Sequence, residues 1–193
     1  HTLLLHSTYA LSTPQQIGTL GGSPVMGCLP KQPIPQQTVQ IDMNGLELDR
    51  QTDRCAHGSA DTALFVWPLA NYAAWHKASG IDHTAGVAAS DPYGGHFGEN
   101  LLVDGEYASE ERIRIGDIWL WGERRVEVTT PRQPCYMLNI AVPGALGWAL
   151  RTGLCGWYFK LLNGPGPVPA YEAQLQLLQT GSGPTIAEAF RSK

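Results

Sequence analysis

One cysteine of this chain lies in a loop that two prolines make stiff. The loop belongs to the stretch TTPRQPCYMLN, residues 129–139. Pro131 and Pro134 each fix their own φ angle, and each pushes the preceding residue toward extended geometry. We therefore expect the loop to hold Cys135 in one defined position.

Arg132 stands in the same loop, three residues before this cysteine. A guanidinium beside a thiol favours the thiolate form, and it also binds anionic groups through two parallel hydrogen bonds. A thiolate can act as a nucleophile or as the ligand of a soft, redox-active metal. A lone cysteine after a proline is nevertheless more often a small buried hydrophobic residue, so the loop alone leaves both interpretations open.

Two other loops are rich in polar residues and lie at the ends of expected strands. They read CAHGSAD at 55–61 and GGHFGEN at 94–100. His57 could orient an anion or act as a base, although an ordinary surface histidine would look the same. Together with Cys135 and Asp61 it would permit a thiol hydrolase or acyltransferase. Nothing in the sequence shows that these three residues are close together.

The composition excludes several classes of protein. The chain has 193 residues, 43% of them hydrophobic and 16% charged, with 22 Gly and 14 Pro, which is typical of one globular domain with many short elements. The formal net charge of -4 and the scattered Lys and Arg residues provide no basic stripe for nucleic acid. No apolar run approaches the ~20 residues of a membrane-spanning helix, and the first residues lack the pattern of a signal peptide. We expect a soluble, cytoplasmic protein that binds neither nucleic acid nor membrane.

Alternating and helical patterns predict a mostly-β domain with a few short helices. Asn44 and Gly45 supply a tight hairpin turn, and the spacing of Thr185 and Glu188 predicts the capped start of a final helix. We set the first sixteen residues apart as an N-terminal extension or vector-derived segment, and we expect one domain over 17–193. The expected elements are a hairpin at 39–48, strands at 63–67, 100–103, 113–128 (a meander), 155–162 and 171–179, and helices at 68–79, 145–152 and 184–190. Such a fold is a barrel or folded sheet that carries its chemistry on loops.

Four segments in a fixed order resemble one known family, the MOSC domain, named after the C-terminal part of molybdenum cofactor sulfurases. They are HGSADTALFVWP, FGENL, GDIWLWGERRVEVTTPRQPCYMLN and TGLCGWYFKLL, and the resemblance runs from about Ile17 to Phe190. Within that family the chain resembles small bacterial MOSC proteins that reduce N-hydroxylated bases such as hydroxylaminopurine. The ordered set of motifs is far more specific than any one of them.

The resemblance implies a MOSC-type β-barrel that binds a pyranopterin molybdenum cofactor. In that family the cysteine of the P-R-x-P-C-type loop is the protein ligand of molybdenum, which here is Cys135. The backbone N–H groups of Gly58 and Gly98 would approach an anion closely, because no side chain intervenes. By the same resemblance, the residues that line the cofactor cleft are His57, Gly58, Asp61, Gly98, Glu99, Asn100, Arg132, Tyr136 and Asn139.

The implied activity is a molybdenum-dependent reduction of a small N-hydroxylated substrate. Electrons would come from a separate flavin or iron–sulfur reductase, because four dispersed cysteines cannot hold a cluster and no G-x-G-x-x-G loop is present. The alternative is a module that carries the cofactor, or a sulfur atom on Cys135, without turnover. Both functions need the same thiolate.

Two departures from the family pattern matter. The family commonly has H-G-G followed by D-R-A, where this chain has His57-Gly58-Ser59 and Asp61-Thr62-Ala63. The missing arginine weakens the expectation of a phosphate clamp at this loop. Small bacterial members also carry a helical extension beyond the final segment, and the sequence here stops at Lys193, which leaves the delivery of electrons open.

Overall fold

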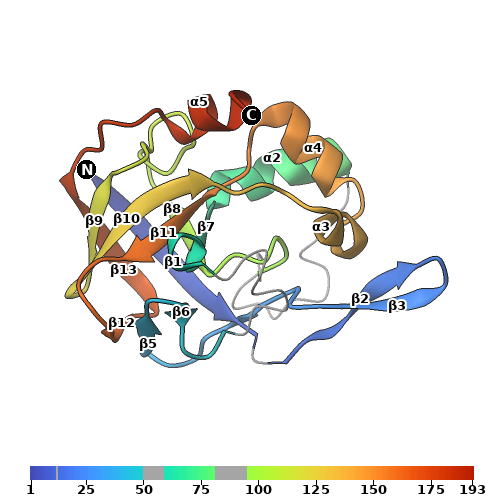
Figure 1. Ribbon diagram of the computed structural model, residues 1–193, viewed down its shortest axis with the longest axis horizontal. Helices are drawn as coiled ribbons and strands as arrows, with labels where there is room; N and C mark the ends of the chain where they lie inside the picture. Colours follow the sequence, from blue (N-terminus) through green and yellow to red (C-terminus); the bar gives the residue numbers. More distant parts are fainter. Residues whose placement is uncertain (12, 50–58, 81–94) are drawn as a thin grey trace.

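A closed β-sheet forms the body of the protein in the computed structural model, which describes residues 1–11, 13–49, 59–80 and 95–193 (Figure 1). The strands of the main sheet follow the order β13-β9-β10-β11-β7-β8-β1-β4. Because β1 also pairs with β13, seven of these eight strands close into a barrel, and β4 extends the sheet beside β1. Only the pair β7–β8 among them is parallel. The expected mostly-β barrel is therefore confirmed.

The strands and helices have the following bounds. The strands of the main sheet are β1 Thr2–Ala10, β4 Gln32–Pro33, β7 Leu64–Pro68, β8 Leu101–Asp104, β9 Ile118–Trp121, β10 Arg124–Pro131, β11 Trp157–Leu161 and β13 Tyr171–Gln179. The smaller sheets contain β2 Gln15–Leu20, β3 Ser23–Gly27, β5 Thr38–Asp42, β6 Gly45–Leu46 and β12 Gly166–Pro169. The helices are η1 Ala60–Thr62, α2 Leu69–Ser79, α3 Tyr136–Ala141, α4 Ala145–Thr152 and α5 Ile186–Arg191.

Several local predictions are confirmed. The predicted hairpin is present as β5 and β6, but Asp42 pairs with Gly45, so its two turn residues are Met43 and Asn44, one position earlier than expected. Helix α2 ends at Gly80, which adopts the left-handed conformation with φ 65°. Helix α5 begins with the expected capping box, in which Thr185 and Glu188 bond reciprocally. These features depend on neighbouring residues, which a sequence pattern captures well.

Two segments differ from expectation. Strand β1 lies between β8 and β13 within the barrel, although it falls in the residues that we had set apart from the domain. Its alternating Leu3 and Leu5 point into the core, with 0% and 2% exposure. The expected strand at 113–115 is instead a loop with one isolated bridge, Arg114 to Thr185, because the backbone here bonds to the start of α5.

Two apolar clusters lie on the two sides of the barrel wall. The cluster inside the barrel includes Trp119, Trp121 and Trp157, each fully buried. The outer cluster packs the wall against α2, α3 and α4, with Trp67 stacked on Phe97 at 4.4 Å between ring centroids. Strand β7 is buried on both faces, which explains why its sequence is continuously apolar rather than alternating.

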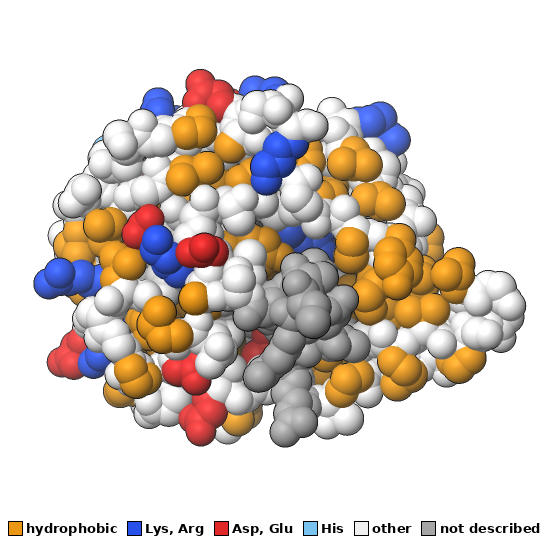
Figure 2. Space-filling view, in the orientation of Figure 1, with side chains coloured by type: hydrophobic (Ala, Val, Ile, Leu, Met, Phe, Trp, Pro, Cys, Tyr) orange, Lys and Arg blue, Asp and Glu red, His pale blue; other side chains and the backbone are white. Residues whose placement is uncertain are grey.

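The hairpin β2–β3 projects away from the barrel and packs at its base against α3 (Figure 1). Apolar side chains gather on this side of the surface (Figure 2). The exposed apolar residues of these elements are Leu20, Met26 and Tyr136. Within the described residues, no helix is long and apolar enough to cross a membrane.

Candidate functional site

The cysteine loop is tied down at both ends. At its start, Pro131 of β10 pairs with Trp157 of β11, and the Arg132 N–H donates to the carbonyl oxygen of Gly156 at 3.2 Å. At its end, Cys135 is the N-cap residue of α3, in extended geometry with φ -117° and ψ 171°. Its carbonyl oxygen accepts from the Leu138 N–H at 3.1 Å. The backbone is thus fixed on both sides of Cys135, whose side chain is half-buried.

Arg132 is a buried cation on the same loop as the Cys135 thiol. Its residue exposure is 8%, and its guanidinium carbon lies 5.0 Å from the centroid of the Phe65 ring, a cation–π contact. No carboxylate of the described residues forms an ion pair with it. Burial raises the pKa of the neighbouring Tyr158, while Arg132 lowers it and Cys135 raises it. Tyr158 therefore lies within electrostatic reach of both Arg132 and Cys135.

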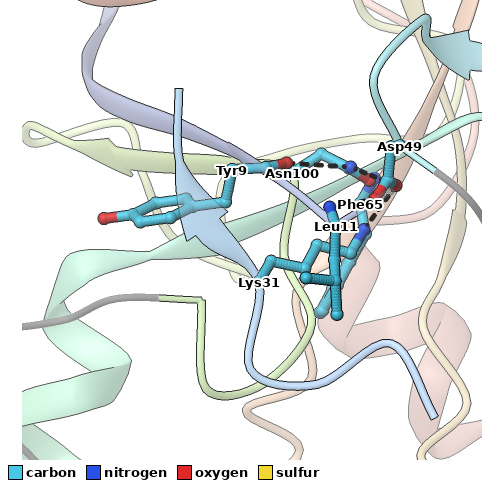
Figure 3. Close-up of polar contacts among 6 residues, drawn as sticks. All are labelled: Tyr9, Leu11, Lys31, Asp49, Phe65 and Asn100. Atoms are coloured by element: carbon cyan, nitrogen blue, oxygen red, sulfur yellow. Dashed lines mark hydrogen bonds and ion pairs between the residues drawn. The ribbon is translucent and has the colours of Figure 1, made fainter. Parts of the chain in front are cut away.

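Asn100 is the centre of a buried polar network (Figure 3). Its side-chain oxygen accepts from the Phe65 N–H at 3.0 Å, and its amide nitrogen donates to Asp49 Oδ2 at 2.7 Å and to the Tyr9 carbonyl at 3.3 Å. Its own backbone bonds to the same two strands, through Tyr9 N–H and Phe65 carbonyl. This side chain, 1% exposed, joins β1, β7 and the segment that ends at residue 49.

Lys31 and Asp49 complete this network and were not predicted from the sequence. Lys31 Nζ lies 2.7 Å from Asp49 Oδ2, and both side chains are nearly fully buried. The other carboxylate oxygen of Asp49 accepts from the Leu11 N–H at 3.0 Å. Buried ion pairs of this kind need such additional donors to offset desolvation. Only the presence of a lysine among prolines, KQPIP, hinted that this segment was unusual.

Glu99 is wholly buried, and its carboxylate bonds to the protein. One oxygen accepts a short hydrogen bond from the Tyr72 hydroxyl, and the other accepts from the Phe97 N–H at 3.1 Å. Burial raises the pKa of Glu99 to about 7. The neighbouring Gly98 N–H donates to the Gly95 carbonyl at 3.0 Å. These groups fix the shape of the FGEN loop, and their contact with a cofactor stays a prediction.

The remaining expected site residues lie at the surface or outside the described residues. His57 and Gly58 belong to the latter group, so the proximity of His57 to Cys135 is not described. The Asp61 carbonyl accepts from the Thr129 hydroxyl, which ties η1 to the strand that leads into the cysteine loop. Tyr136 is 60% exposed beside Cys135, and Asn139 Oδ1 accepts from the Gly144 N–H at 3.0 Å.

Three of the predicted residues thus lie at one end of α3: Arg132 and Cys135 on the loop before it, and Tyr136 as its first residue. Across the described ranges, no three His, Cys, Asp or Glu side chains converge to hold a metal ion. A metal at Cys135 would therefore depend on ligands that it brings with it. The structure also adds two aromatic neighbours of Arg132 that sequence reasoning missed, Phe65 and Tyr158, because both come from strands distant in the chain.

Comparison with known proteins agrees with the family resemblance of the sequence motifs. A family profile described as MOSC domain matches residues 31–172. The chain is 35% identical over 147 residues to Protein YiiM of Escherichia coli (strain K12), covering 75% of this chain and 61% of that protein. It is 33% identical over 148 residues to Uncharacterized protein YflK of Bacillus subtilis (strain 168), covering 76% and 61%. A protein of Gibberella moniliformis named Reductase is 33% identical over 111 residues, 55% of this chain and 18% of that protein.

Solved structures share the fold. A hypothetical protein of known crystal structure superposes with a TM-score of 0.71 at 28% identity, covering 97% of this chain and 74% of the other. The crystal structure of YiiM from Escherichia coli gives 0.63 at 28% identity, covering 97% and 75%. In the sequence alignments, the matched part of this chain spans 61% of the length of each of the two bacterial relatives, YiiM and YflK.

Proposed function

Because the chain belongs to the MOSC domain family, we propose that Cys135 is the protein ligand of a pyranopterin molybdenum cofactor and that the loaded protein reduces N-hydroxylated compounds. The observation that carries the proposal is the buried Arg132 guanidinium of the Cys135 loop, which acts on the same Tyr158 as Cys135 and has no carboxylate partner among the described residues. The fungal relative that is named a reductase supports the redox class.

The residues present fit such a group. A buried cation is costly unless an anion compensates its charge, and the cofactor's anionic groups would supply that charge at Arg132. A thiolate is a soft ligand that suits a soft, redox-active metal. A single protein ligand is sufficient when the metal arrives with an organic scaffold of its own, which agrees with the lack of a three-residue metal-ligand group among the described residues.

When bound, the cofactor would supply the two-electron chemistry that breaks the N–O bond of the substrate. The overall reaction consumes two electrons and two protons per N-hydroxyl group and releases the amine and one water. A separate flavin or iron–sulfur reductase would supply the electrons. In this scheme Cys135 fixes the position of the metal and Arg132 orients the cofactor. Tyr136 lies exposed at the rim beside Cys135, where a planar substrate would meet it.

Metal analysis of protein from a host that makes the cofactor tests this proposal. We expect molybdenum and reduction of an N-hydroxylated base, with chemically reduced viologen as donor, in the wild type. Both should be lost in Cys135→Ala and kept in Cys28→Ala, a matched change at another half-buried cysteine. Molybdenum at background in the wild type, or retention of metal and activity in Cys135→Ala, contradicts the proposal. Metal binding or a persulfide on Cys135 without any turnover would instead identify a carrier.

A further inference from the structure

A buried carboxylate lies behind the cysteine loop and belongs to none of the predicted motifs. Glu110 is 3% exposed, and its Oε1 accepts three hydrogen bonds. The donors are Asn71 Nδ2 at 2.7 Å, the Gly156 N–H at 2.8 Å and the Cys155 N–H at 3.2 Å. Burial raises the pKa of Glu110, and the hydrogen bonds oppose that effect. A carboxyl group in this position is costly unless its donors are kept in place.

Gly156 joins this carboxylate to the cysteine loop. Its N–H donates to Glu110, and its carbonyl oxygen accepts from the Arg132 N–H at 3.2 Å. Its φ angle is 66°, and a Cβ at this position would lie 2.3 Å from the Val66 carbonyl oxygen. Gly156 is therefore in a conformation that only glycine adopts easily. Its carbonyl oxygen also accepts from the Cys155 thiol at 3.3 Å.

The opposite side of Glu110 is anchored to the helices. Asn71 comes from α2, and the backbone carbonyl of Glu110 accepts from the Ala187 N–H of α5 at 2.9 Å. Tyr72, the next residue of α2, bonds to Glu99 of the FGEN loop. Two successive residues of α2, Asn71 and Tyr72, thus hold the two buried glutamates.

We propose that Glu110 is a positioning residue for Cys135. It fixes the Cys155–Gly156 turn, and through the Gly156 carbonyl it sets the point from which the cysteine loop begins. The inference rests on the proposed function, in which Cys135 must meet a metal at a fixed place. The geometry itself requires no metal, so it can be tested on the protein without cofactor.

The test compares four variants of the full chain. Glu110→Ala removes the carboxylate, and Glu110→Asp draws it back from Gly156 by about one methylene length. Glu110→Gln keeps an oxygen acceptor at the same reach. Asn71→Ala removes one donor on the helix side and leaves the contact with Gly156 intact. The measurements are the exchange rate of the Arg132 backbone amide by NMR, the alkylation rate of Cys135 by iodoacetamide with peptide mapping, and the free energy of unfolding.

We expect Glu110→Ala and Glu110→Asp to speed exchange of the Arg132 amide roughly tenfold, because the bond to Gly156 is loosened. The alkylation rate of Cys135 should change several-fold in the same variants. Glu110→Gln should restore both rates to within about twofold of the wild type. Asn71→Ala should leave them near wild type even where it lowers stability. If Glu110→Ala does not fold, Glu110→Asp gives the same comparison.

The inference is overturned if both rates are unchanged in the Glu110 variants. It is also overturned if Asn71→Ala changes them as much as Glu110→Ala does at equal stability, because the effect is then one of general loosening. Molybdenum content of the same proteins separates this outcome from failure of the proposed function. If no protein contains metal but both rates change as expected, the proposed cofactor is rejected and the positioning role of Glu110 is retained.

Discussion

Asn100 donates to Asp49 inside the protein, with 2.7 Å between Nδ2 and Oδ2. The same carboxylate oxygen lies 2.7 Å from Lys31 Nζ, so one buried oxygen receives an amide and an ammonium group. Because Asn100 also bonds to β1 and β7, this contact fixes one side of the candidate site to the barrel wall. The contribution of this contact to the free energy of unfolding can be measured by replacing the amide nitrogen of Asn100 with oxygen.

Asn100→Asp replaces the amide donor by a carboxylate that faces Asp49. Two buried carboxylates next to one lysine repel each other, and we expect the free energy of unfolding to fall by about 3 kcal/mol or more. Urea denaturation at neutral pH measures it. Asn139→Asp is the matched control, because that residue is exposed and its side-chain oxygen only accepts from Gly144. A loss at Asn100 as small as that at Asn139 would show that the network contributes little.

The raised pKa of Glu99 should make the free energy of unfolding depend on pH. Its pKa is raised to about 7 in the folded protein from the ordinary 4.5. A raised carboxyl pKa means that the folded state binds the proton more tightly, so this contribution is fully present below about pH 4.5 and is lost as the pH rises to about 7. Glu99→Gln should remove up to ~3 kcal/mol of that decline.

The measurement is the free energy of unfolding of wild type and Glu99→Gln between pH 4 and 8. Glu110 also has a raised pKa, and it lowers the free energy of unfolding with rising pH equally in both proteins. The difference between the two curves therefore isolates the contribution of Glu99. Parallel curves would mean that Glu99 titrates at its ordinary pKa and that the Tyr72 hydroxyl stabilises the ionised form.

The cysteines Cys135 and Cys155 should differ sharply in reactivity. Cys155 is 1% exposed, and burial together with the nearby Glu110 raises its pKa well above the ordinary range. Iodoacetamide at pH 8 should therefore label Cys135 at least roughly tenfold faster than Cys155 in the native protein. Labelling in urea is the control, where both should react at similar rates. Equal labelling without urea would show that the turn before β11 opens readily.

Local features of the fold were predictable, and long-range ones were not. The hairpin of β5 and β6, to within one residue at its turn, and the capping box of α5 follow from residues a few positions apart. Cys135 and Arg132 were found because prolines make their loop stiff. The contact between Asn100 and Asp49 joins residues 51 positions apart. A buried polar residue of this kind has the same sequence signature as a surface residue, and only the closure of the barrel reveals its partner.

The N-terminal segment differs from the prediction for another reason. Its alternating leucines are an ordinary strand pattern, but the segment was predicted to be an extension outside the domain. The structure places it between β8 and β13, where it closes the barrel. The burial of Glu110 was not predicted, for a third reason. It lies in the acidic run SEER, which reads as a solvated surface, while its neighbour Glu111 does face solvent and pairs with Arg191.

Gly156→Ala tests whether the turn behind the cysteine loop tolerates any side chain. The new methyl group would meet the Val66 carbonyl oxygen at 2.3 Å and the Phe65 ring at 2.8 Å, in addition to the cost of a positive φ angle. Gly164→Ala is the matched control, because its φ is 78° and no atom lies within 4 Å of the new Cβ. We expect about 1 kcal/mol from the φ angle alone at Gly164 and about 3 kcal/mol or more at Gly156. Urea denaturation of both variants gives the comparison. Equal losses would mean that Val66 and Phe65 move aside freely, and the Glu110–Gly156–Arg132 connection would then lack the rigidity that a positioning role requires.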